Sequence, residues 1–193
     1  LNKLSAFGQI SRTIGKRFTL SAGIRTDVNN YATTMSNPWD QISPRISASY
    51  ALTEIIAFNF NGGIYYQLPA YTVLGYRDSQ SGELTNKTNG VTFIQSKHLV
   101  SGLEFNLPRN TRITFEGFYK HYDNYPFLTE DSIALANLGA DFGTIGNAPV
   151  TSTGYGRSYG LEFLLQQKLY QGFYGLLSYT WVRSEFADKR GMY

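Results

Sequence analysis

The stretch Ile56-Ala-Phe-Asn-Phe-Asn-Gly-Gly-Ile-Tyr-Tyr-Gln-Leu68 carries the pattern that decides the fold of this chain. Its even-numbered positions are apolar residues or glycine, while Ala, Asn, Gly and Gln fill most of the odd-numbered positions. Successive side chains of a β-strand point to opposite faces of the sheet. The stretch is therefore predicted to be a strand with one apolar face and one polar face.

The same alternation recurs along the chain, most weakly at its beginning. The sequence predicts eight strands, at residues 4–14, 17–27, 43–53, 56–68, 99–107, 113–119, 159–165 and 173–181. Short turns of three residues alternate with long polar segments in the connections. The predicted turns are 15–17, 53–55, 108–110 and 170–172, and the long segments lie near 29–42, 69–95 and 123–156. All short turns should therefore lie at one edge of the sheet and all long loops at the other.

The composition restricts where such a sheet can lie. Only 16% of the residues are charged, whereas a soluble domain usually carries about a quarter. The longest apolar run, even with Gly counted, is the six residues 172–177, so a membrane-spanning helix of about 20 apolar residues is excluded. The net charge is only +3 and the basic residues are scattered. No nucleic-acid partner is therefore expected.

The polar faces of the strands decide between a water-soluble sandwich and a barrel in lipid. They consist mostly of Ser, Thr, Asn, Gly and Gln, whereas the outer face of a sandwich in water is normally rich in Lys and Glu. The apolar spans are about 9 to 11 residues long, enough for a tilted strand to cross the hydrocarbon layer. Aromatic residues lie near both ends of these spans, as in interfacial belts. We predict an all-β, antiparallel, up-and-down transmembrane β-barrel segment, with a soluble all-β ligand-binding module, such as a carbohydrate-binding sandwich, as the alternative.

Several short sequence motifs, which occur in a fixed order, also resemble those of a known protein family. They cover nearly all of residues 10–188, and their succession is more specific than any one of them. The chain resembles the barrels of TonB-dependent outer-membrane receptors at Ser43-Pro-Arg-Ile-Ser47, Tyr65-Tyr-Gln-Leu-Pro69, Gly117-Phe-Tyr-Lys-His-Tyr122 with Asn124-Tyr-Pro126, and Gly156-Arg-Ser-Tyr-Gly-Leu-Glu-Phe163.

The resemblance implies that residues 1–193 form about eight strands of a 22-stranded barrel, without its plug domain and closing strands. It implies an outer-membrane location in a Gram-negative cell and active import of a scarce or bulky nutrient, such as a siderophore, vitamin, glycan or peptide. Energy would come from TonB and its inner-membrane complex through the absent plug segment. Outer-membrane lipid and a surface lipoprotein are further candidate partners, and no cofactor is expected.

No set of residues in the sequence indicates catalysis. Cysteine is absent, and parity places the two histidines, His98 and His121, on opposite faces of neighbouring strands. Glu104, Glu116 and Glu162 share the polar face, where they are expected to pair with basic side chains or with a plug domain. The chain is therefore predicted not to be an enzyme, and no metal site is expected.

The long loops are the better candidates for ligand contact, because barrels bind their ligands through loops held by rigid strands. Tyr71, Tyr76 and Arg77 combine aromatic stacking surface with a fixed positive charge, a combination suited to sugars or anionic chelates. These three residues are the candidate ligand-binding site. Phe127 and Phe142 in the third long segment supply further aromatic surface.

Overall fold

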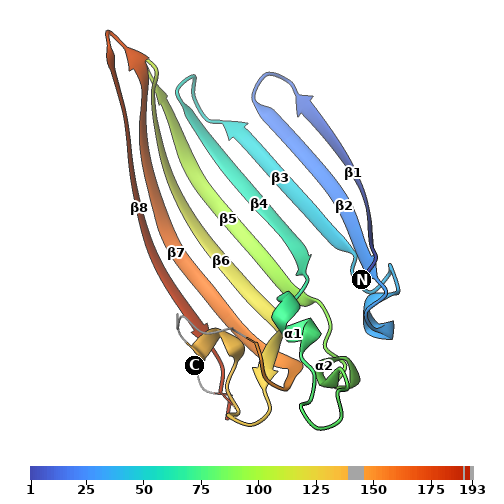
Figure 1. The fold of residues 1–193 in the computed structure, drawn as a ribbon. Helices are drawn as coiled ribbons and strands as arrows, with labels where there is room; N and C mark the ends of the chain where they lie inside the picture. The colour runs from blue at the N-terminus through green and yellow to red at the C-terminus, as the bar shows by residue number, and fades with distance from the viewer. Residues whose placement is uncertain (139–145, 189, 192–193) are drawn as a thin grey trace.

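A single curved sheet forms the body of the molecule in the computed structural model, which describes residues 1–138, 146–188 and 190–191 (Figure 1). Its eight strands pair antiparallel in sequence order, so β1 and β8 form the two edges. They are β1 (Lys3–Ile14), β2 (Phe18–Asn29), β3 (Ser43–Ala51), β4 (Ile56–Gln67), β5 (Ile94–Leu107), β6 (Thr111–Leu128), β7 (Val150–Tyr170) and β8 (Phe173–Phe186). The prediction of eight up-and-down strands is confirmed. The sandwich alternative is wrong, since the described strands form one sheet rather than two packed layers.

The register of the sheet confirms the predicted faces. Phe58, Leu103, Phe115 and Phe163 lie opposite one another across β4 to β7, in one continuous row. The neighbouring row places Glu104 opposite Thr114. We call the side that carries Phe115 the apolar face and the side that carries Glu104 the polar face. Many large side chains of the apolar face are exposed in the chain by itself, because nothing in the structure covers them.

The short turns lie together at one end of the sheet, as predicted (Figure 1). Residues 15–17 and 108–110 are the predicted turns of three residues. The predicted three-residue turn at 53–55 is wrong, because β3 ends at Ala51 and the four residues 52–55 join it to β4. The prediction of a three-residue turn at 170–172 is wrong. Only Gln171 and Gly172 separate β7 from β8, and both have positive φ angles of 50° and 84°. This is the backbone that favours two-residue hairpins, and the pairing shifts by one residue next to it.

The strands are longer at the loop end than the alternation predicts. β6 continues to Leu128 and β7 begins at Val150, so the third connection covers 129–149 instead of 123–156. The pairing of β6 with β7 is irregular between Tyr122 and Phe127. Such irregularity breaks the two-residue period without ending the strand. Sequence alternation therefore detects only the regular part of these two strands.

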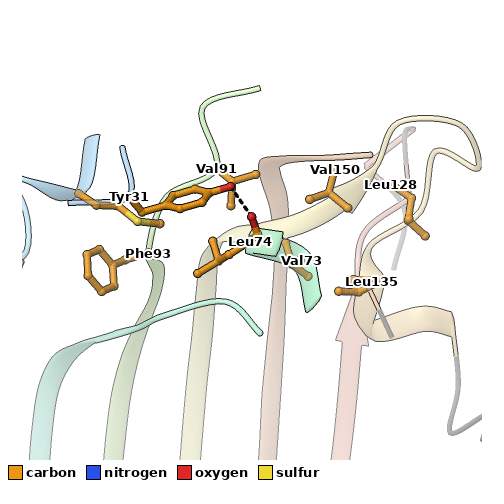
Figure 2. Close-up of a cluster of buried hydrophobic side chains, with 9 residues drawn as sticks. Tyr31, Val73, Leu74, Val91, Phe93, Leu128, Leu135 and Val150 are labelled. Carbon is orange, nitrogen blue, oxygen red and sulfur yellow. Dashed lines mark hydrogen bonds between the residues drawn. The ribbon is translucent and has the colours of Figure 1, made fainter. Parts of the chain in front are cut away.

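Short helical segments and the buried core lie at the loop end. They are η1 (Thr33–Met35), α1 (Tyr71–Gly75), α2 (Thr85–Thr88) and η2 (Leu135–Leu138). None of the helices in the described residues is long and apolar enough to span a membrane. The main cluster of buried apolar residues joins all three long connections and consists of Tyr31, Met35, Val73, Leu74, Val91, Phe93, Leu128, Leu135 and Val150 (Figure 2). We call this cluster with its surrounding loops the loop platform.

Candidate functional site

The loop platform holds segments that are far apart in the sequence. Tyr31, from the first long connection, donates a hydrogen bond from its hydroxyl to the carbonyl oxygen of Leu74 in α1, at 2.9 Å (Figure 2). Burial raises the pKa of the Tyr31 hydroxyl above its ordinary value. The hydroxyl therefore stays protonated at neutral pH and remains a donor. The first and second connections are thus joined by packing and by a buried hydrogen bond.

Asn86 connects the second and third long connections. Its fully buried side chain donates to the carbonyl oxygens of Val73 and Ala148, at 2.7 and 3.1 Å. The backbone N–H of Val150 donates to Asn86 Oδ1 at 2.8 Å. A single amide thereby pairs with three backbone groups: a buried one in α1, a partly buried one at Ala148 in the third connection, and a buried one at Val150, the first residue of β7. Because each group would be costly to bury unpaired, these hydrogen bonds hold the two connections as one body.

Tyr71 begins α1 and has an exposed ring on the loop platform. Its hydroxyl accepts a hydrogen bond from the ammonium group of Lys3 at the start of β1. The Lys3 nitrogen lies 4.6 Å from the centre of the Tyr71 ring, within the range of a cation–π interaction. The ring thus lies beside a positive charge contributed by a different strand.

Arg77 lies in a separate tight turn of the same connection. Its guanidinium donates to the carbonyl oxygen of Gly82 at 2.8 Å. Asp78 accepts hydrogen bonds from the backbone N–H groups of Gln80 and Ser81, at 3.0 and 2.8 Å. These hydrogen bonds lower the pKa of the Asp78 carboxyl, because they favour its charged form. The turn is therefore fully formed at neutral pH and loses this support only as the carboxylate is protonated in acid.

The structure keeps the three predicted ligand-binding residues on one connection but in different surroundings. Tyr71 and Arg77 are exposed, and Tyr76 between them is half-buried. Among the described residues, the three side chains make no hydrogen bond or ring contact with one another. Phe127, named for its aromatic surface, lies within β6 and is partly buried. Phe142 lies outside the described residues.

The polar face carries ion pairs and a stacked aromatic group. Arg112 contacts Glu104 at 2.7 Å, as predicted for the lumen charges, and Arg25 contacts Asp27 at 2.6 Å. Tyr65 lies 4.4 Å from the Arg45 guanidinium and 4.5 Å from the His98 ring, measured from its ring centre. This face is therefore polar and ordered, as expected of a surface that lines an enclosed, wet interior.

Two carboxylates on the polar face have no basic partner among the described residues. Glu116 of β6 lies directly opposite Glu162 of β7 in the register, and neither is in an ion pair of the described chain. Like charges directly opposite across strands repel each other. Their expected pairing with basic side chains of this chain is therefore not seen among the described residues.

The register confirms that the two histidines face opposite sides. His98 lies opposite Lys120, whereas His121 lies opposite Lys97 one position along. In the described part of the chain, no three side chains of His, Cys, Asp or Glu are grouped as a metal site requires.

Sequence reasoning missed two residues of the loop end. Asn86 gave no signal, because an Asn in a polar loop looks the same whether it is buried or solvated. Trp39, in the first connection, has an exposed ring and lines a pocket of about 250 Å³ together with Pro38 and Ile24. An isolated Trp within a polar segment was the available sequence signal for this residue.

The family model for the β-barrel of TonB-dependent receptor-like proteins matches residues 2–192. The chain belongs to this family. TonB-dependent receptors are outer-membrane receptors and transporters of Gram-negative bacteria, not enzymes. No curated protein sequence matches the chain.

Solved structures of TonB-dependent receptors share the fold at low sequence identity. The FrpB iron transporter from Neisseria meningitidis has a TM-score of 0.62 and 13% identity, over 99% of this chain and 27% of its own. The pyoverdine receptor FpvA from Pseudomonas aeruginosa PAO1 has a TM-score of 0.64 and 15% sequence identity, and the match covers 98% of this chain and 26% of FpvA. The ferric-catecholate import receptor Fiu from E. coli K12 has a TM-score of 0.64 and 16% sequence identity, and the match covers 98% of this chain and 28% of Fiu. This TonB-dependent receptor chain therefore spans about a quarter of their length.

Proposed function

We propose that this chain forms part of the barrel wall and of the extracellular binding platform of a receptor that imports a scarce or bulky nutrient across the outer membrane. In this proposal the apolar face lies against lipid, and the polar face lines the lumen. The observation that carries it is the buried cluster that unites three long connections at one end of the sheet. A platform of this kind presents loop residues in fixed positions, which lowers the entropic cost of ligand capture.

The proposal assigns energy coupling to TonB, acting through a plug segment that lies outside this chain. The opposed carboxylates Glu116 and Glu162 support a lumen occupant that carries positive groups. A basic side chain of the plug would relieve the repulsion between them. The chain contributes no catalysis in this account.

The proposed capture site consists of Tyr71, Tyr76 and Arg77, next to the Lys3 ammonium. Stacking rings with fixed positive charge suit anionic metal chelates, and rings with hydrogen-bonding groups also suit sugars. Among the similar structures, FrpB is an iron transporter, Fiu is a ferric-catecholate import receptor, and FpvA has been solved as a complex with a pyoverdine and Fe. Another is the copper transporter OprC. These names make a metal chelate the first ligand class to test for this chain.

Replacing Tyr71, Tyr76 and Arg77 together by Ala in the intact receptor is expected to weaken equilibrium binding of its nutrient at least about tenfold, or roughly 1.4 kcal/mol. The nutrient is first identified by uptake in a deletion strain grown on a panel of ferric siderophores, cobalamin, glycans and peptides. Binding is then measured by titration calorimetry of the purified receptor.

The matched control replaces Glu54, Arg109 and Gln171 by Ala at the short-turn end of the sheet. These positions lie at the proposed periplasmic edge, so binding is expected to be unchanged. Equal affinities of the wild type and the loop variant, with normal folding, would remove Tyr71, Tyr76 and Arg77 from the site.

A further inference from the structure

A pocket of about 380 Å³ lies on the polar face, across strands β1 to β4. Two guanidinium groups line it, those of Arg25 and Arg45, and so do two aromatic rings, those of Phe7 and Tyr65. The other polar side chains of its lining are amides and hydroxyls, namely Gln9, Ser21, Ser47 and Asn61. No carboxylate of the described chain lines this pocket. Positive charge and hydrogen-bonding groups therefore dominate it, and we call it the wall pocket.

Arg45 is oriented by ring packing. Its guanidinium lies 4.4 Å from the centre of the Tyr65 ring, within the range of a cation–π interaction. The centre of the Tyr65 ring is in turn 4.5 Å from that of His98, and the two planes are tilted by 32°. A hydrogen bond of 2.6 Å joins His98 Nε2 to Ser96 Oγ. This stack of three side chains holds the Arg45 guanidinium in place.

Glycines on both sides of Arg45 make room for the stack and for the pocket. Gly23 of β2 and Gly63 of β4 are the direct neighbours of Arg45 in the register. A Cβ at Gly63 would lie 3.2 Å from both Arg45 Cγ and Tyr65 Cε2, so a side chain there would displace the stack. A Cβ at Gly23 would meet its nearest atom only at 3.4 Å. The floor of the wall pocket beside Arg45 is therefore open space.

Arg45 also differs from the other arginines of the polar face in its partners. Arg25 pairs with Asp27 at 2.6 Å, and Arg112 pairs with Glu104 at 2.7 Å. Arg45 is exposed and takes part in no ion pair within residues 1–138, 146–188 and 190–191. Because a guanidinium carries five N–H donors in a fixed planar fork, Arg45 presents an uncompensated charge and free donors to the wall pocket.

The wall pocket lies near the loop end of the sheet. Arg45 is two residues from the loop end of β3 at Ser43, and Tyr65 is two residues before the end of β4 at Gln67. The connection that leaves β4 here carries the proposed capture residues, of which Tyr71 is the first. A ligand that moves from the loop platform into the lumen along this side therefore meets the wall pocket.

We propose that the wall pocket binds an anionic oxygen group, a carboxylate or a phosphate, of a small-molecule ligand inside the barrel. The proposal adds a second site to the capture site and rests on the proposed function, which places the polar face in the lumen. The planar guanidinium of Arg45 matches the paired oxygens of either group. Asn61 and Ser47 supply further donors, and the rings of Phe7 and Tyr65 offer contact to apolar parts of the ligand. The uncompensated charge favours an anion over a neutral sugar or peptide.

A fluorine label tests this site without knowledge of the natural ligand. Ser21→Cys, which lines the wall pocket two residues from Gly23, is alkylated with a trifluoromethyl reagent in the intact receptor in detergent. Fluorine NMR then follows titration with citrate or with inorganic phosphate. At least one of the two anions is expected to shift the signal saturably, with a dissociation constant of about 1 mM or tighter. No shift with either anion would overturn the proposal.

Two variants in the labelled background test the roles of the charge and of the open floor. Arg45→Gln keeps hydrogen-bonding groups but removes the charge, and it should weaken anion binding at least about tenfold, whereas Arg45→Lys should weaken it about threefold. Gly23→Val leaves Arg45 in place and fills the floor of the wall pocket, so it should also weaken binding at least about tenfold. If Arg45→Gln does not fold, Gly23→Val decides the outcome.

Matched controls separate the wall pocket from general electrostatic attraction. Lys120 lies opposite His98 on the same face but outside the pocket lining. Lys120→Gln removes one positive charge, and anion binding should stay within about twofold of the wild type, because salt screens charges at this range. The neutral triamide of citrate should cause no shift. Equal anion binding by the wild type and Gly23→Val, or a shift that the triamide reproduces, would overturn the proposal.

A spin label at the same cysteine distinguishes failure of this proposal from failure of the proposed function. If the label is accessible to a water-soluble nickel chelate but neither anion binds, only the wall-pocket proposal fails. A carboxylate of the plug that already occupies Arg45 would produce this result. If the label is instead accessible to oxygen in the bilayer and not to the chelate, the assignment of the polar face to the lumen fails as well.

Discussion

Phe115→Arg is expected to destabilise the intact, refolded barrel by about 2 to 4 kcal/mol, the usual cost of an Arg facing lipid near the bilayer midplane. Phe115 lies in the middle of the apolar face, between Leu103 and Phe163 in the register. Its ring packs against the rings of Phe105 and Phe163, with centres 6.4 and 4.8 Å away. The free energy of unfolding, measured by denaturant titration in lipid vesicles, gives the cost directly.

Thr114→Arg is the matched control, because Thr114 is the adjacent residue on the polar face. Thr114 itself is only 7% exposed, so the longer guanidinium side chain has to extend past its neighbours into the lumen, beside Glu104, which lies opposite Thr114. Its cost is expected to be less than half that of Phe115→Arg. Equal destabilisation by the two variants would refute the assignment of the faces.

Asn86→Ala is expected to loosen the loop platform by about 3 kcal/mol, while the sheet stays folded. The substitution leaves the carbonyls of Val73 and Ala148 and the N–H of Val150 without their partner. Each buried unsatisfied group costs about 1 to 3 kcal/mol. Hydrogen exchange at the Val150 amide should therefore become more than about a hundredfold faster, because local opening controls exchange there.

Asn89→Ala serves as the control for Asn86→Ala. Asn89 is exposed, and its side chain donates a hydrogen bond to the carbonyl oxygen of Val150 at 3.1 Å. Its loss should cost less than about 1 kcal/mol and change exchange at Val150 at most about fivefold. Similar exchange rates in the two variants would show that Asn86 is not what joins the second and third connections.

The sheet could be predicted from the sequence because each strand has the same repeating constraint. One face must be apolar and the other polar, so a shift of one residue would reverse every side chain. This constraint is readable wherever pairing is regular, as at Ile56–Gln67. The alternation is less clear near Tyr122, where the register is irregular. It also does not determine the length of the turn at Gln171, because the register shifts by one residue beside that turn.

The loop platform could be predicted only in part. Tyr71, Tyr76 and Arg77 were identifiable as candidates from residue type, and their exposure or partial burial is compatible with that hypothesis. Their separate surroundings, with Lys3 beside Tyr71 and the Asp78 turn beside Arg77, depend on contacts that no periodic pattern encodes. The role of Asn86 depends on packing between segments about 60 residues apart. Sequence alternation carries no information on such contacts.

Oxygen accessibility of spin labels along β6 tests the central claim most directly, namely that this sheet is a barrel wall with lipid on one face. Single cysteines are introduced at positions 112 to 119 of the intact receptor, which is then reconstituted in lipid bilayers. The account predicts accessibility that alternates with a period of two residues, with maxima at Ile113, Phe115 and Tyr119 and minima at Arg112, Thr114 and Glu116. Uniform accessibility, or maxima at the even-numbered positions, would contradict it.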